Sequence, residues 1–150
     1  MRIEIGSGTR AHLRELINNL RPDDRAELEA DGRPVRHVLH EVWSNSDDPQ
    51  VGLINGKVGA CWGLTNSLLE TEGHAWLFTT REVERIPVLF VKLARVQLAR
   101  MLSTHHSLVS SVACDYTRAI RFLQLLGFTF ESTFIQGPDG KEFRLVRRER

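Results

Sequence analysis

The chain has 150 residues, a formal net charge of +1 and a hydrophobic fraction of 41%. This length suits one domain, residues 1–150, whose core needs no disulfides. The near-neutral charge gives no overall field that would attract nucleic acid or an anionic membrane. Cys61 and Cys114 are far apart in expected strands, as is typical of buried thiols in a reducing compartment. The chain starts without the apolar core of a signal peptide and has no stretch long enough to span a bilayer, so we expect a protein that is not secreted.

The first part of the chain predicts one strand and three helices. Charged and apolar residues alternate over Arg2–Ile5, which indicates a short strand. Apolar residues then recur at helical spacing between residues 13 and 20. A second helix opens with Pro22 and two carboxylates and stops at Gly32. A third helix is expected over Val35–Trp43, and the polar residues 44–49 end it.

A hairpin follows these helices. Val51–Ile54 and Val58–Leu64 flank Asn55-Gly56, the strongest short-range hairpin signal in the chain. The second arm is rich in glycine and alanine, and such a strand often lets a neighbouring group or a ligand approach closely.

Two strand–helix units make up the centre of the sequence. His74–Thr80 and Ser107–Cys114 read as strands, and Asp115 stands where a cap of the second helix would be. The first helix is predicted from an apolar face that consists of Ile86, Leu89, Phe90, Leu93, Val96 and Leu102. Two such units in series favour a parallel strand pair covered by helices, with any site where the two strands end.

The C-terminal part predicts a second hairpin and a basic end. Phe128–Ile135 and Phe143–Val146 flank a turn rich in glycine and proline. The arginines of the end are Arg144, Arg147, Arg148 and Arg150. We interpret them as a solvated strand edge rather than as a nucleic-acid-binding arm.

The whole order is β, helices, ββ, βα, βα, ββ, a mixed α/β (α+β) sheet around a central parallel strand pair. It resembles the GNAT superfamily of N-acetyltransferases, and the tail carries the motif: residues 119–123, the pair Gly127-Phe128 and the closing hairpin. The resemblance implies the GNAT fold and, in an active member, acetyl transfer from acetyl-CoA to an amine.

A closer likeness is to acetyltransferase-like internal virion proteins of short-tailed bacteriophages. Residues 119–128 and 140–145 carry it, together with Trp62 and the strand residues 76–80. This resemblance implies phage structural proteins as partners, and the host cytoplasm or the virion as location.

The loop expected to hold the cofactor departs from the GNAT pattern. Backbone N–H groups at a helix start would bind the pyrophosphate of coenzyme A, and in the family glycines let that backbone come close. Here residues 81–87 contain no glycine, and Glu82 and Glu84 bring negative charge to the same place. Arg81, Val83 and Arg85 remain as candidate cofactor contacts. We expect no bound cofactor, with acetyl-CoA as the alternative.

The acid and the base of the reaction are also in doubt. In the family a tyrosine four residues before the Gly-Phe pair usually protonates the thiolate, and here that residue is Leu123. Tyr116, about two helical turns earlier, is the only tyrosine. Candidates for a base are Glu70, Glu72 and Asp115, although Asp115 is explained more simply as a helix cap.

No metal site is expected. His37 and His40 have a spacing that can share a metal, but no third ligand stands at a telling distance. The sequence therefore leaves three functions open: a non-catalytic internal virion or assembly component, an active N-acyltransferase with an unusual cofactor loop, and a small binding module. The first is favoured because two of the three requirements for acetyl transfer fail.

Overall fold

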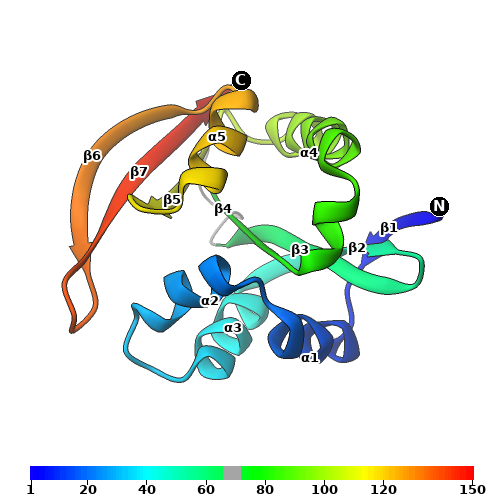
Figure 1. Cartoon of the computed structure of the whole chain (residues 1–150). Coiled ribbons are helices and arrows are strands. Elements are labelled where there is room, and N and C mark those ends of the chain that lie inside the picture. The colour runs from blue at the N-terminus through cyan, green and yellow to red at the C-terminus, as the bar shows by residue number, and fades with distance from the viewer. Residues whose placement is uncertain (66–71) are drawn as a thin grey trace.

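The computed structural model describes residues 1–65 and 72–150. Over these residues the chain forms one mixed sheet with the strand order β1-β2-β3-β4-β5-β7-β6 (Figure 1). The predicted order of strands and helices is confirmed. The strands are β1 (Ile3–Ser7), β2 (Ser46–Ile54), β3 (Lys57–Thr65), β4 (Glu72–Thr79), β5 (Ser107–Ala113), β6 (Thr129–Gln136) and β7 (Lys141–Glu149).

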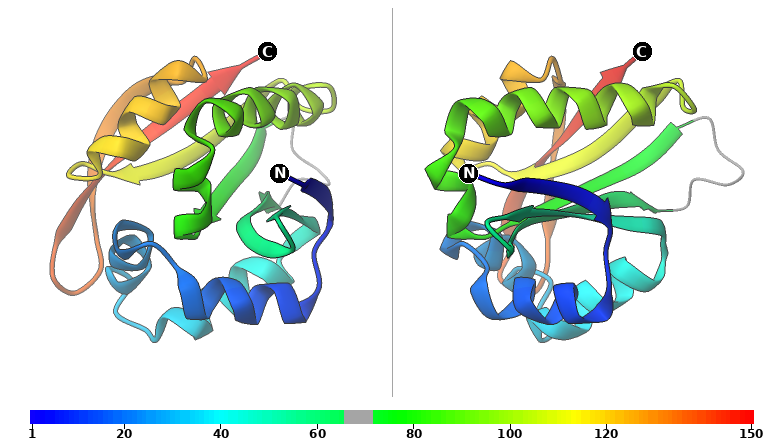
Figure 2. Two further views of the ribbon diagram at one scale, coloured as in Figure 1. Left: turned by 45° about the vertical axis from the view of Figure 1, so that its right-hand side comes forward. Right: turned by 90° about the vertical axis from the view of Figure 1, so that its right-hand side faces the viewer.

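The helices form two layers, one on each face of the sheet (Figure 2). Helices α1, α2 and α3 cover one face, and α4 and α5 cover the other. Their bounds are α1 (Arg10–Asn19), α2 (Pro22–Glu29), α3 (Val35–Ser44), the 3-10 helix η1 (Arg81–Arg85), α4 (Pro87–Leu102) and α5 (Thr117–Leu125). No helix within the described parts of the chain is long and apolar enough to cross a membrane.

Each layer buries its own apolar cluster. Between α1, α3 and the β2–β3 hairpin lie Leu13, Leu16, Leu39, Trp43 and Cys61. The cluster on the other side joins α4 and α5 to β5 and β7 and includes Leu98, Leu102, Leu108, Val112 and Val146. Complete burial of such side chains stabilises a fold by roughly 1.5–3 kcal/mol each, so the two clusters anchor the helices to the sheet.

Local sequence explains several of the element boundaries. Thr9 caps α1, because its hydroxyl accepts a hydrogen bond from the His12 backbone at 3.2 Å while the His12 ring accepts one from the Thr9 backbone at 3.1 Å. The Asn55-Gly56 turn joins β2 and β3 with both residues at positive φ, as the hairpin signal predicts.

Three sequence-based expectations are wrong. Residues 46–49 belong to β2 instead of forming a polar break, and the strand absorbs them through a register shift between Asp47 and Gln50. Asp115 is not the cap of α5; Tyr116 takes that position without a side-chain hydrogen bond. In α4, Leu89 and Val96 are 39% and 50% exposed, because the face turned to the sheet runs through Phe90, Ala94 and Met101 instead.

The C-terminal arginines act at the ends of helices. Arg148 donates to the carbonyl of Leu126 at 3.0 Å, just after α5, and Arg150 donates to the carbonyl of Leu102 at 2.7 Å, at the end of α4. Carbonyl groups at a helix end have no partner within the helix, and a guanidinium satisfies them while complementing the helix dipole. Two arginines of the basic end are therefore structural contacts rather than a free solvated edge.

Candidate functional site: the cleft between β4 and β5

The two parallel strands at the centre of the sheet pair only at their beginnings. Among the described residues three pairs connect them, from Glu72 with Ser107 to His74 with Val109. Beyond that point β4 continues along β3 and β5 continues along β7, so the strands diverge towards their carboxyl ends. Diverging parallel strands leave backbone groups and space unclaimed by the sheet, and this is where open α/β sheets bind ligands.

Cavities open on both sides of the gap. One, of about 430 Å³, lies towards α4 and α5; the other, of about 440 Å³, lies towards α2, α3 and the β6–β7 hairpin. Four residues line both: Glu27, Leu77, Ser110 and Ser111. The two cavities thus meet at the gap, and Glu27 is the ionisable side chain among the residues that line both.

A buried carboxylate bridges the open end of the gap. Asp24 of α2 is 5% exposed, and its Oδ2 accepts hydrogen bonds of 2.6 Å from both the backbone N–H and the hydroxyl of Thr79, the last residue of β4. Its Oδ1 accepts a 2.6 Å bond from the Tyr116 hydroxyl, just before α5. Asp24 therefore links the ends of the two diverging strands across the mouth of the cleft.

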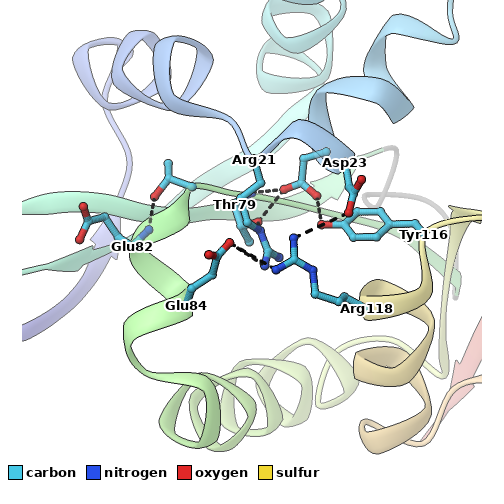
Figure 3. Close-up of polar contacts among 9 residues, drawn as sticks. Arg21, Asp23, Thr79, Glu82, Glu84, Tyr116 and Arg118 are labelled. Atoms are coloured by element: carbon cyan, nitrogen blue, oxygen red, sulfur yellow. Dashed lines mark hydrogen bonds and ion pairs between the residues drawn. The ribbon is translucent and has the colours of Figure 1, made fainter.

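Charged side chains surround this bridge in Figure 3. Arg21 donates its Nε to the Thr79 hydroxyl at 2.7 Å. Glu84 of η1 lies 3.3 Å from Arg118 and 3.9 Å from Arg21, and Arg118 also lies 3.7 Å from Asp23. We call the set of Arg21, Asp23, Asp24, Thr79, Glu84, Tyr116 and Arg118 the mouth network.

The segment after β4 gives little room for a diphosphate. The Thr80 hydroxyl accepts the Glu82 backbone N–H at 3.2 Å, and the Glu82 carboxylate pairs with Arg85 at 3.2 Å. Val83 is 4% exposed, so its side chain belongs to the core. Of the candidate cofactor contacts, Arg81 is exposed and Arg85 is already paired. The first helical turn is 3-10, it carries two carboxylates, and both of them are neutralised by arginines.

Tyr116 is held away from solvent. It is 3% exposed, and burial together with the neighbouring Asp24 raises the pKa of its phenol well above the ordinary value. The phenol therefore stays protonated and donates to Asp24. Leu123, in the position of the family's tyrosine, lines the cavity on the α4 side of the gap.

The other sequence-based candidates do not gather at the mouth. Glu72 lies at the opposite, paired end of the cleft, where it accepts a bond from the Ser107 hydroxyl at 2.9 Å and pairs with Arg147. The Asp115 side chain is 76% exposed and lies 3.7 Å from the Lys141 ammonium. Glu70 lies outside the described residues. The structure thus brings Tyr116 to the cleft but leaves Glu72 and Asp115 in ion pairs away from its centre.

Glu27 is a site residue that the sequence analysis missed. It projects from α2 into the centre of the gap, where its Oε2 accepts the backbone N–H of Ala113, the last residue of β5, at 3.1 Å. Burial, with a smaller contribution from Asp24, raises its pKa to about 7. Asp24 and Glu27 have a spacing that places both carboxylates on one face of a helix. This spacing is the feature of the sequence that could have identified Glu27 as a site residue. Within the described residues no group of three or more histidine, cysteine or acidic side chains could hold a metal.

Two helical layers around a sheet whose central parallel strands diverge define the fold of GNAT N-acetyltransferases, as the resemblance predicted. The structure is similar to spermidine N-acetyltransferase from Vibrio cholerae, solved with CoA and spermine, at a TM-score of 0.71 and 12% identity over 98% of this chain and 95% of that chain. It is similar to ribosomal-protein-alanine N-acetyltransferase from Brucella melitensis at a TM-score of 0.71 and 13% identity, over 98% of this chain and 99% of that chain. A GNAT-family acetyltransferase from Streptococcus pneumoniae matches at a TM-score of 0.64 and 15% identity, over 99% of this chain and 100% of that chain. No family model and no curated protein sequence matches the chain.

Proposed function

We propose that this protein keeps the acetyltransferase fold without transferring acetyl groups, and that it works by association as an internal virion or assembly component of a short-tailed phage. The observation that carries the loss of catalysis is the bridge formed by Asp24. It engages the last N–H of β4 and the phenol of Tyr116, so a strand donor and the nearby proton donor are both committed to internal contacts.

The charges at the mouth support the same conclusion. A diphosphate needs unpaired N–H groups and a net positive surrounding. The segment here supplies Glu82 and Glu84, whose charges are balanced by Arg85 and by the pair Arg21 and Arg118. An arriving diphosphate would have to break these pairs and would then lie next to two carboxylates.

Phage association rests on the sequence resemblance. It predicts phage structural proteins as partners and a location in the host cytoplasm, the virion or both. Purified particles of the phage that carries the gene should contain this protein at a fixed copy number, measured by quantitative mass spectrometry. Its absence from both particles and assembly intermediates would contradict this part of the proposal.

Thermal unfolding with coenzyme A and with acetyl-CoA tests the catalytic part. A ligand at 100 times its Kd stabilises the folded state by about 2.7 kcal/mol, which for a chain of this size raises Tm by roughly 5–10 °C. We expect no rise with either ligand. The Vibrio cholerae spermidine acetyltransferase, whose structure contains CoA, serves as the positive control in the same buffer. A clear rise in this protein would overturn the proposal.

Glu27 favours a second candidate, an active N-acyltransferase. A carboxyl with a pKa of about 7 in the centre of the cleft has the protonation behaviour of a general base for an amine. Arg81 and Arg85 would then hold the donor in place of a glycine loop. This candidate predicts that acetyl-CoA raises Tm, that Arg81→Ala with Arg85→Ala removes the rise, and that Glu27→Gln abolishes acetyl transfer while the rise remains. A rise that survives the double arginine substitution would exclude this cradle.

A further inference from the structure

A third cavity lies beneath α4, between that helix and the face of the sheet. Its volume is about 130 Å³. The helix contributes Phe90, Leu93, Ala94, Gln97 and Met101 to its wall. Its sheet side runs from Ile3 and Ile5 of β1 to Ser110 of β5. It therefore extends from the β4–β5 gap, where Leu77 and Ser110 line it, to the N-terminal edge of the sheet.

The wall of this cavity is almost entirely hydrocarbon. Among the described residues that line it, Gln97 and Ser110 carry the only amide and hydroxyl side chains, and none is charged. Water in a buried site needs two to four polar partners, which this wall does not offer. An apolar cavity of similar size, about 150 Å³ in an engineered protein, stays dry and binds benzene. The cavity is thus a site for an apolar group rather than for water.

Small side chains create the space. Ala60 of β3 and Ala75 of β4 form part of the sheet side, and Ala94 faces them from α4. The glycines of the strands do not contribute in the same way, because a Cβ at Gly59 would lie 2.7 Å from the Ile54 side chain and one at Gly52 would lie 3.3 Å from Trp62. Alanines from β3, β4 and α4 therefore line the open space, and Ala60 belongs to the strand whose composition suggested close approach of a ligand.

The shape of the cavity indicates the kind of ligand. Its wall draws residues from β1, β2, β3, β4 and β5, which are successive neighbours in the sheet. Neighbouring paired strands lie about 4.8 Å apart, so the part of the wall on β1, β2, β3 and β4 alone extends over roughly 14 Å. A cavity of 130 Å³ that extends over such a length has a small cross-section. This matches an extended alkyl chain and not a bulky ring system.

One end of the cavity reaches solvent. Ile5 lines it and is 36% exposed on β1, the edge strand of the sheet. The opposite end lies under α5, at the buried residues Leu126 and Phe128. A chain would therefore enter at the β1 edge and leave its polar end there. Among the described residues no charged side chain lines the wall, so nothing there would pair with a carboxylate, and a neutral polar end such as a hydroxyl is sufficient.

We propose that the cavity beneath α4 binds a neutral, unbranched alkyl chain of medium length, with the polar end at the β1 edge. The proposal requires no reaction, although the cavity adjoins the cleft: six residues line both it and the cleft cavity on the α4 side, namely Leu77, Val83, Phe90, Ser110, Phe122 and Leu123.

The two methionines of the chain provide a direct test. Met101 lines the cavity, whereas Met1 is 71% exposed at the N-terminus. In protein labelled with ¹³C at the methionine methyl groups, 1-octanol should shift the Met101 signal saturably and leave Met1 unchanged. Ethanol at the same concentration, which has the polar end without the chain, should shift neither signal. Parallel, unsaturated changes in both signals would overturn the proposal.

Substitutions on α4 complete the test. Ala94→Leu fills the cavity and should weaken octanol binding at least tenfold. Ala99→Leu adds the same atoms to an exposed position of the same helix and should leave binding unchanged. An Ala94→Leu protein that folds and binds octanol as the wild type does would refute the site. If it does not fold, Gln97→Leu replaces the only amide of the wall among the described residues by a branched alkyl group and should change the octanol affinity. An unchanged saturation curve would refute the site equally.

Discussion

The two ends of the β4–β5 cleft are held by different means. At the paired end, backbone pairing from Glu72 to His74 joins the strands, and the Glu72–Arg147 ion pair adds to an existing ladder. At the open end no ladder exists, and Asp24 of a helix holds the strand ends together through one carboxylate. Side chains at the first end supplement the sheet, whereas at the second they replace it. Substitutions should therefore have much larger effects at the mouth.

The largest expected effect is that of Asp24→Ala. It removes the acceptor of three hydrogen bonds and leaves the buried donors of Thr79 and Tyr116 without a partner. A buried donor left without a partner costs about 1–3 kcal/mol, and for the donors of Thr79 and Tyr116 together we expect a loss of about 4 kcal/mol by urea denaturation. The adjacent Asp23→Ala, which removes a half-exposed carboxylate 3.7 Å from Arg118, is the control and should lose less than about 1 kcal/mol. Equal losses would show that the bridge does not hold the mouth.

Glu27 should make stability depend on pH. Its pKa is about 7 in the folded protein and near 4.5 when unfolded, so the folded state binds the extra proton between these values. The free energy of unfolding should therefore fall as pH rises from 4.5 to 7, by about 3 kcal/mol in total from this group. Glu27→Gln should remove that decline and be more stable than the wild type at pH 8. Parallel pH curves for the two proteins would contradict the assignment.

Tyr116→Phe should have an intermediate effect. It deletes one donor to Asp24 but keeps the ring, so the loss should be about 1–2 kcal/mol. Because both residues belong to one network, the Tyr116→Phe and Asp24→Ala losses should not add. A double-mutant cycle measures this coupling, and strict additivity would argue that the hydroxyl contributes through a different partner.

The smallest effect is expected at the paired end. Glu72→Gln keeps an acceptor for the Ser107 hydroxyl and weakens a partly exposed ion pair with Arg147, which also pairs with Glu131 at 2.8 Å. The loss should be about 0.5–1 kcal/mol and should shrink in high salt. A loss comparable to that of Asp24→Ala would erase the difference between the two ends.

The order of elements could be read from the sequence because its signals are local. The Asn55-Gly56 turn and the periodicity after Pro87 each specify one element without knowledge of the rest of the chain. The exposure of side chains was less predictable, because periodicity marks the apolar positions of α4 but does not tell which of them the helix turns towards the sheet. Leu89 and Val96 were misjudged for this reason.

The mouth network could not be predicted in the same way. Asp24 contacts Thr79 and Tyr116, which lie 55 and 92 positions away, and only the docking of α2 across the gap brings them together. From the sequence, Asp24 is one of two ordinary carboxylates at the start of a helix, and Glu27 has no evident role. The missing glycines of residues 81–87 were visible in the sequence, but the carboxylate that bridges the cleft instead was not.

The hydrogen bonds of Asp24 also affect how the cleft opens. The amide hydrogen of Thr79 is protected by a side chain of α2 rather than by a neighbouring strand at this point. Its hydrogen exchange with solvent should therefore report the opening of α2, even though the residue belongs to a strand. In terms of cooperative units, the last residue of β4 belongs with the helical layer, and the mouth of the cleft opens only when that layer does.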